Sequence, residues 1–278
     1  MKIIAHIDEL RKCLVEESKP IGFVPTMGFL HEGHISLVRR ARQECASVVS
    51  SIFVNPTQFG PGEDLSRYPR DLPRDLSMLE TAGVDITWTP LAEEMYPEGY
   101  NSWVNVEGIT KRLEGEVRPS HFQGVTTVVT KLFHIVDPQK AYFGQKDAQQ
   151  LAVIRKMARD LNFPIEIIPC PTVREKDGLA MSSRNVYLSP EERRAATVIF
   201  RALGTARLEF QNGERDANKL RDTLKKILSS EPLAVPQYVS CADTETLKEI
   251  EKVQEKALLS MAVHVGKTRL IDNLILEE

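Results

Sequence analysis

The chain has 278 residues, of which 42% are hydrophobic and 27% are charged, and its formal net charge is −3 at pH 7. This length suits one large domain, or one domain with a smaller companion, and the composition is that of an ordinary globular protein. The small negative charge gives no support to non-specific binding of nucleic acid or of an anionic membrane.

Hydropathy and cysteine spacing both favour a cytoplasmic protein. No apolar run approaches the roughly 20 residues of a membrane span, and the charges at Asp8 and Glu9 come too early for a signal peptide. The four cysteines form neither a Cys-x-x-Cys pair nor a zinc-binding spacing. We therefore expect reduced thiols and no membrane partner.

The first part of the chain alternates predicted strands and helices. Short β-branched runs predict buried strands, and apolar residues at helical spacing predict the helices. In chain order we expect strand 21–26, helix 30–46, strand 48–54, helix 74–82, strand 85–89, helix 125–136, strand 140–143, helix 148–161 and strand 165–168. This alternation predicts an α/β fold with a Rossmann-like parallel sheet and helices on both faces.

The pattern changes after Pro171. Ser189-Pro190-Glu191-Glu192 is typical of a helix start, and the helix is expected to run to Gln211. Further elements are expected as helix 215–229, strand 237–242, helical stretch 245–252, and strands 257–265 and 268–275. We therefore predict a Rossmann-like domain over 1–172 and a smaller α+β domain over 173–278.

The run from Pro25 to His34, Pro-Thr-Met-Gly-Phe-Leu-His-Glu-Gly-His, lies between a predicted strand and a predicted helix. His31 and His34 share one face of the first helical turn, beside unpaired backbone N–H groups and the positive end of the helix dipole. That position suits phosphate. The alternative is that His31 caps the helix and His34 packs, and these ten residues alone do not decide.

Two further motifs follow predicted strands, at the sheet edge where ligands of such folds bind. Asn55-Pro56-Thr57-Gln58-Phe59-Gly60 offers neutral amides for a polar substrate, or simple turn chemistry. In 144–150, Gly-Gln-Lys-Asp-Ala-Gln-Gln, Lys146 suits a phosphate. Asp147 suits a ribose, a base edge or a helix N-cap, and Gln150 suits either the cap or a substrate.

The fourth motif, Met181-Ser182-Ser183-Arg184-Asn185, lies in the predicted joint between the domains. Two hydroxyls followed by a guanidinium form a compact anion-binding group. A loop that carries this group could close over a bound nucleotide. A flexible linker is the alternative. The chain has no P-loop, no dinucleotide fingerprint and no Gly-x-Ser-x-Gly elbow.

Taken together, these motifs resemble the pantothenate synthetase (pantoate–β-alanine ligase) family. His31-x-Gly33-His34 and the Met-Ser-Ser-Arg loop are similar to those of the wider nucleotidylyltransferase superfamily with its His-x-Gly-His motif, and four motifs in this order are far more specific. The resemblance spans the whole chain. One departure is Lys176, where the family usually has proline, outside the residues assigned to chemistry.

The resemblance implies a set of site residues. The implied ATP-binding residues are Met27, Gly28, Phe29, Leu30, His31, Glu32, Gly33, His34, Gly144, Gln145, Lys146, Asp147, Val173, Met181, Ser182, Ser183 and Arg184. Those implied in catalysis are His34 as proton donor, His31, Lys146, Ser182, Ser183 and Arg184. Gln58 and Gln150 would hold pantoate, Gln58 also β-alanine, and Asp75 is a weaker candidate for contact with Mg²⁺.

The implied reaction condenses (R)-pantoate with β-alanine to pantothenate, in the biosynthesis of coenzyme A. The pantoate carboxylate attacks the α-phosphate of ATP to give pantoyl adenylate and pyrophosphate, and β-alanine then displaces AMP. Magnesium should accompany ATP, chiefly through phosphate oxygens. The implied partners are these small molecules and a second copy in a homodimer, with no nucleic acid.

Two alternatives differ in function class. One is another adenylyl-transferring enzyme acting on a different acid, and the other is a nucleotide-binding sensor on the same fold. The chain has both phosphate-binding motifs and both substrate glutamines, which argues against a sensor. A sensor needs only to bind the nucleotide, so it could lose either the phosphate-binding motifs or the glutamines and still bind.

Overall fold

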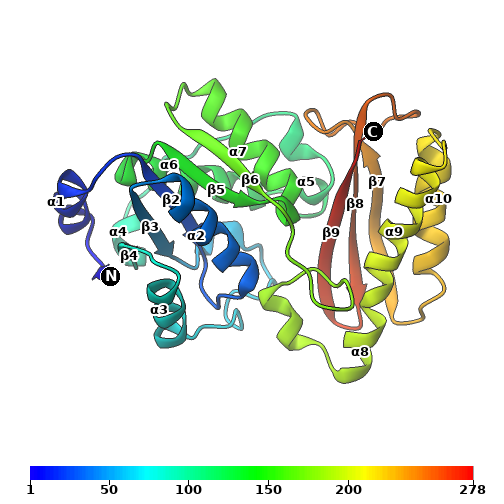
Figure 1. Cartoon of the computed structure of the whole chain (residues 1–278), viewed down its shortest axis with the longest axis horizontal. Helices are drawn as coiled ribbons and strands as arrows, with labels where there is room; N and C mark the ends of the chain where they lie inside the picture. The colour runs from blue at the N-terminus through cyan, green and yellow to red at the C-terminus, as the bar shows by residue number, and fades with distance from the viewer. Residues whose placement is uncertain (278) are drawn as a thin grey trace. The chain divides into compact units, whose positions relative to one another are not determined.

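The computed structural model describes residues 1–277, which form two compact units (Figure 1). The first unit comprises Met1–Glu107, Arg118–Gln145 and Val153–Pro171. The second comprises Gly108–Val117, Lys146–Ala152 and Thr172–Glu278. Among the described residues, no helix is long and apolar enough to cross a membrane.

A parallel sheet forms the centre of the first unit. In the described part of the chain it has six strands in the order β1-β4-β3-β2-β5-β6, and all five pairings are parallel. The strands are β1 (Lys2–Ile4), β2 (Ile21–Thr26), β3 (Ser47–Ile52), β4 (Ile86–Trp88), β5 (Lys140–Gly144) and β6 (Glu166–Cys170). The α/β fold class expected from the alternating pattern is confirmed.

Five longer helices connect these strands: α1 (Ile7–Glu16), α2 (Glu32–Glu44), α3 (Leu72–Thr81), α6 (His121–Val136) and α7 (Ala148–Asp160). Parallel crossovers are right-handed, so the direction of each crossover decides which face its helix covers. The connections through α2 and α3 run toward β4, and those through α1, α6 and α7 run the opposite way. Helices α2 and α3 therefore cover one face of the sheet, and α1, α6 and α7 cover the opposite face. In agreement, α2 contacts α3 and α1 contacts α6.

The core of the first unit follows from the apolar stripe of α2. Ile35, Val38 and Ala41 are at most 4% exposed and pack against Val24 of β2 and Val48 of β3. Figure 1 shows α2 lying across the strands in this way. Burial of this stripe holds α2 in place against the sheet. It thereby positions the amino end of α2, where His31 and His34 lie.

The second unit has its own antiparallel sheet, with three strands within residues 1–277: β7 (Ala234–Ala242), β8 (Lys256–Val265) and β9 (Thr268–Glu277). Helices α9 (Thr197–Gln211) and α10 (Ala217–Leu228) lie along it (Figure 1). Short helices complete the chain: α4 (Ala92–Met95), α5 (Glu114–Val117), α8 (Pro190–Ala195), and the 3₁₀ turns η1 (Pro56–Gln58), η2 (Ile109–Lys111), η3 (Gln145–Asp147) and η4 (Ser183–Tyr187).

Two sequence expectations in the second unit are wrong. The helix expected over 190–211 is interrupted at Ala196, which separates α8 from α9. The helical stretch expected over 245–252 is a turn instead. The Asp243 carboxylate accepts the backbone N–H groups of Glu245 (3.2 Å) and Thr246 (2.7 Å), and this local bonding competes with a helix. Leu247 then takes a left-handed conformation, with φ of 54°.

Several elements lay beyond the sequence pattern. Strand β1 and helix α1 were not expected, because β1 has only three residues and two of them are exposed. Helix α6 begins at His121, four residues before the predicted 125. Ser120, a residue type that favours helix starts, precedes it but makes no capping bond through its side chain.

Candidate active site

The order of strands places a topological switch beside β2. From β2 the chain goes to β3 and then β4 on one side, and β5 and β6 lie on the other. Ligands of such sheets bind beyond the carboxyl ends of the strands at this reversal. The loop 27–31 leaves β2 there, and Gln145 follows the neighbouring β5.

Both motif histidines cap the start of α2. His31 is its N-cap residue, and its Nδ1 accepts the backbone N–H of Gly33 at 3.2 Å. The backbone N–H of His31 donates to Nδ1 of His34 at 3.3 Å, and the two ring centroids are 4.1 Å apart. The capping interpretation of His31 is therefore confirmed, and His34 takes part in the same cap.

Capping and phosphate chemistry are compatible here. A neutral imidazole whose Nδ1 accepts a hydrogen bond carries its proton on Nε2, so each ring presents an N–H donor from its far side. Both rings are partly exposed at the amino end of a 13-residue helix, where the dipole favours an anion. The caps thus set the tautomer of both rings.

Asp75 of α3 holds the loop that leads to these histidines. Its side chain is 1% exposed, and its two carboxylate oxygens accept the backbone N–H groups of Phe29 and Leu30, each at 2.7 Å. Burial raises the pKa of Asp75, although the two N–H groups oppose the rise. Gly28 has φ of 83°, and a Cβ there would lie 3.1 Å from Asp75 Oδ2, so glycine is needed at that position.

The sequence singled out Asp75 only as a candidate contact for Mg²⁺. The structure gives its two oxygens a role as acceptors for the loop of the first motif. Contact with an ion stays a prediction. No sequence signal pointed to the loop contact, because Asp75 lies 45 residues from Leu30 along the chain.

Gln58 of the Asn-Pro motif contacts Met27 of the histidine motif. Gln58 is 8% exposed in η1, and its Nε2 donates to the Sδ of Met27 at 3.1 Å. Asn55 is 1% exposed and donates from Nδ2 to Gln58 Oε1 at 3.0 Å and to the Gly124 carbonyl at 3.1 Å. The loops after β2 and β3 therefore converge, and Asn55, the first amide of the Asn-Pro motif, holds the side chain of the second, Gln58.

In the second unit, Lys146 is held by the carboxyl-terminal strand. Its carbonyl accepts a hydrogen bond from Asn273 Nδ2 of β9 at 2.8 Å, and its Nζ lies 3.7 Å from Asp147 Oδ1. Gln149 is 6% exposed and donates to the carbonyl groups of Ile109 and Arg112. These bonds fix the chain on both sides of Asp147, while Gln150 is partly exposed.

The serine–arginine loop is folded within its unit and is not a flexible linker. Ser182 caps η4 by accepting the Arg184 N–H at 3.2 Å, and Ser183 is 7% exposed. The Met181 N–H donates to the Val173 carbonyl at 3.0 Å. Arg174, next to Val173, forms a two-pronged ion pair with Asp272 of β9, at 2.6 and 2.9 Å.

The expected site residues thus fall into a group in each unit. The first unit contains Met27 to His34, Gln58, Asp75, Gly144 and Gln145. The second contains Lys146, Asp147, Gln150, Val173, Met181, Ser182, Ser183 and Arg184. In the first group, hydrogen bonds join distant members, Asp75 to Phe29 and Leu30 and Gln58 to Met27. In the second group, Lys146 is held by Asn273 of β9, which lies outside the group.

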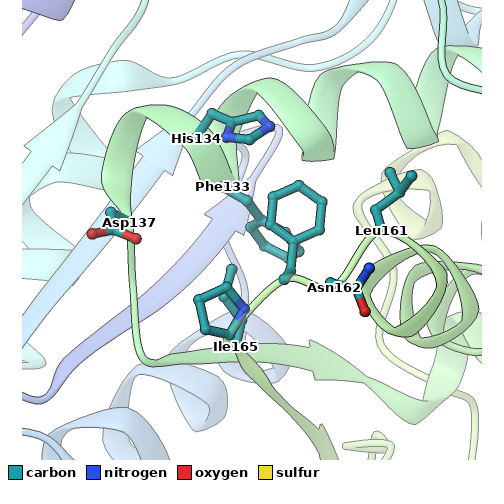
Figure 2. Close-up of a pocket in the computed structure, with 8 residues that line it drawn as sticks. Phe133, His134, Asp137, Leu161, Asn162 and Ile165 are labelled. Atoms are coloured by element: carbon teal, nitrogen blue, oxygen red, sulfur yellow. The ribbon is translucent and has the colours of Figure 1, made fainter.

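A pocket of about 360 Å³ lies elsewhere in the first unit (Figure 2). It is lined by Phe133, His134 and Asp137 at the end of α6 and by Leu161, Asn162, Phe163, Pro164 and Ile165 before β6. These residues precede β5 and β6, so the pocket is at the amino ends of the strands, away from the motif loops. None of the lining residues belongs to the four motifs.

The chain is similar to known ligases over its whole length. Residues 2–275 match the model of the pantoate-beta-alanine ligase family. The chain is 59% identical over 277 residues to the pantothenate synthetase of Roseiflexus castenholzii, covering 100% of each. It is 49% identical to the pantothenate synthetase structure from Thermus thermophilus, with a TM-score of 0.96 and 100% of each chain covered.

The chain belongs to the pantoate-beta-alanine ligase family. Membership confirms the family, the fold class and the ligase class of enzyme that the motifs predict. A further family member, the ligase of Francisella tularensis, is 35% identical with a TM-score of 0.80 over 99% of this chain and 97% of that one. That structure is complexed with beta-gamma ATP and beta-alanine.

Proposed function

We propose that this member of the pantoate-beta-alanine ligase family binds its substrates and catalyses its reaction with residues of the four motifs. The enzyme joins pantoate to β-alanine at the expense of ATP. In the first step a pantoate carboxylate oxygen attacks the α-phosphorus, and the bond to pyrophosphate breaks. In the second step the β-alanine amine attacks the acyl carbon, AMP leaves, and the amine loses a proton as the amide forms.

The observation that carries the proposal is the pair of histidines at the start of α2. With Nδ1 of each ring accepting a backbone N–H, Nε2 becomes the donor. Two such donors, beside the N-terminal N–H groups of α2, suit the negative charge that grows on phosphate oxygens in the first step. We assign Met27 to His34 to ATP. His34 donates an Nε2–H hydrogen bond to the phosphate and keeps its proton, because a neutral imidazole is a very weak acid, and His31 donates to the neighbouring oxygens.

Cationic and hydroxyl groups supply the rest of the phosphate contacts. Lys146 is a point charge, and Arg184 with Ser182 and Ser183 offers several N–H and O–H donors in one short segment. The pyrophosphate leaving group carries the largest charge of the reaction, so fixed positive groups speed its departure. We assign the nucleotide's other contacts to Gly144, Gln145, Asp147, Val173 and Met181.

The neutral amides suit the acid that is activated. Gln58 and Gln150 would hold pantoate by hydrogen bonds to its oxygens, and Gln58 would also meet β-alanine. An amide orients a carboxylate without the strong ion pair that would lower its nucleophilicity. Gln58 is buried beside Met27 of the proposed ATP loop, which supports this placement.

Magnesium fits the proposal as a companion of ATP. Among residues 1–277, no three or more His, Cys, Asp or Glu side chains form a group that could hold a metal ion. Mg²⁺ bound with a nucleotide takes most of its ligands from phosphate oxygens and water, with one or two carboxylates. Asp75, under the loop of the first motif, is the carboxylate that we propose for such a contact, where the ion would neutralise phosphate charge.

Three broader assignments belong to the same proposal. A homodimer and a cytoplasmic location are typical of the family and are proposed here on that resemblance. We also propose that 173–278 acts as a lid. Folding of the Val173–Arg184 segment onto β9 supports the lid, because a loop fixed to a sheet moves with that sheet.

Pyrophosphate exchange tests the function directly. With ATP, Mg²⁺ and labelled pyrophosphate, the enzyme should exchange label into ATP when pantoate is present and β-alanine is absent. AMP should accumulate only after β-alanine is added. Exchange with another carboxylic acid but not with pantoate would assign the chain to a different acid, and no exchange with any acid would favour a nucleotide sensor.

A further inference from the structure

A buried polar network surrounds Gln58 in the first unit. Its outermost member is Tyr96, the residue that ends α4. The Tyr96 hydroxyl donates to Asn55 Oδ1 at 2.8 Å, and the Thr57 hydroxyl donates to the same oxygen at 3.0 Å. On its other side, Asn55 Nδ2 reaches Gln58 Oε1 and the Gly124 carbonyl. Asn55 is 1% exposed, so these partners take the place of water.

The network leaves one orientation for each amide. The Gly124 carbonyl only accepts, so Asn55 must turn its NH₂ group toward it and its oxygen toward Tyr96. The second N–H of Asn55 then points at Gln58, so Gln58 must accept this hydrogen bond with its Oε1. The NH₂ group of Gln58 is thereby turned to the opposite side, where it donates to the Sδ of Met27.

This orientation matters for an acidic substrate. A reversed Gln58 amide would present a carbonyl oxygen to the carboxylate and hydroxyl oxygens of pantoate, and two acceptors facing each other repel. The observed orientation presents N–H donors. A thioether is a weak acceptor, so a substrate oxygen competes well with Met27 for the Gln58 donor.

Tyr96 is itself firmly placed. The ring of Tyr100 packs edge-on against it, with centroids 5.1 Å apart, and the Lys131 ammonium lies 5.7 Å from the Tyr96 centroid. Burial raises the pKa of Tyr96 to about 12, with the bond to Thr57 acting in the opposite direction. The hydroxyl therefore keeps its proton, and remains a donor to Asn55, throughout the neutral pH range.

We propose that Tyr96 is a positioning residue for pantoate: through Asn55, its hydroxyl fixes the Gln58 amide with its N–H donors toward the substrate. The proposal rests on the assignment of Gln58 to pantoate made above. It predicts a specific defect in binding of the acid, because Tyr96 acts through one amide and does not touch the proposed ATP loop.

The test is a double-mutant cycle between Tyr96→Phe and Gln58→Ala, read as KM in pantoate-dependent pyrophosphate exchange. Tyr96→Phe keeps the ring and removes one hydrogen bond, so KM for pantoate should rise about two- to tenfold with KM for ATP unchanged. In the Gln58→Ala background, Tyr96→Phe should raise it no further, because no amide remains to be oriented. Tyr100→Phe, which removes a hydroxyl from the adjacent ring, is the matched control and should leave both constants unchanged.

Each other outcome has a distinct meaning. Equal rises in both KM values, additive effects in the cycle, or no effect of Tyr96→Phe would overturn the role of Tyr96. If Gln58→Ala itself leaves KM for pantoate unchanged, the assignment of Gln58 fails first. Thermal unfolding of all four variants separates a selective binding defect from a general loss of folded enzyme.

Discussion

The two loops assigned to phosphate are held in place by different means. In the first unit, the loop 27–31 joins a buried parallel strand to a helix, so strand topology carries it to the carboxyl edge of the sheet, and Asp75 then holds it there by two backbone hydrogen bonds. In the second unit, Met181 to Arg184 is shaped by Arg174 and its ion pair with Asp272, 98 residues further along the chain. Similar chemistry can thus be carried into place by strand topology or by long-range pairing.

Breaking the Arg174–Asp272 pair should have the largest effect. Asp272 is 2% exposed, and Arg174→Met leaves its charge buried without that partner. We expect a loss of about 3–5 kcal/mol in the free energy of unfolding, measured by urea titration, with weaker ATP binding. Arg193→Met, which breaks an exposed two-pronged pair with Asp177, is the matched control and should cost less than about 1 kcal/mol. Equal losses would contradict the special role of the buried pair.

Asp75→Asn tests the support of the loop in the first unit. The new amide can accept only one of the two N–H groups of Phe29 and Leu30, and it turns its own N–H toward the other. We expect a loss of about 1–3 kcal/mol in unfolding free energy and a higher KM for ATP. Support of the loop by itself predicts a defect that persists at saturating Mg²⁺. The proposed contact with Mg²⁺ adds a part of the defect that recovers as Mg²⁺ is raised, and absence of any recovery would contradict that contact.

His34→Ala separates chemistry from capping at α2. Loss of a donor to the phosphate should slow pyrophosphate exchange at least about tenfold to a hundredfold. Loss of the cap should cost only about 1 kcal/mol of unfolding free energy. His6→Ala, at an exposed histidine, should change neither quantity. Full activity in His34→Ala would leave that residue a purely structural role.

The smallest effect is expected at the Asp243 turn, where local bonding again shapes a loop. Hydrogen bonds from Thr246 hold the pKa of Asp243 below its usual 3.8. The ionised carboxylate therefore stabilises the fold above the unfolded pKa, and this contribution is lost as pH falls below 3.8 through the folded pKa. Asp243→Ala should lower unfolding free energy by about 0.5–1.5 kcal/mol at pH 7 and by less at pH 3. A constant difference between the two pH values would contradict this link.

Within residues 1–277, sequence patterns predicted five of the six parallel strands, because buried β-branched runs leave few alternatives, whereas the short and half-exposed β1 gave no such pattern. Strand β2 was expected at its observed bounds, Ile21–Thr26. The turn after Asp243 was misassigned, because one carboxylate outcompeted helix formation at an exposed, weakly patterned segment. Helix α6 begins four residues before the predicted start and runs through Gly124, a residue type that disfavours helix interiors.

The sequence by itself determined the family and the alternating α/β architecture, and it pointed to the residues that we propose for the chemistry, since motif order and hydrophobic period are local properties of the chain. Only the tertiary structure decided how those residues are oriented. The ring tautomers of His31 and His34, the grip of Asp75 on the loop, and the direction of the Gln58 amide all depend on hydrogen bonds. Asp75 bonds a loop 45 residues away in sequence, and Gln58 is oriented by Asn55, which is itself held by the distant residues Gly124 and Tyr96. That geometry exists only once the strands have paired.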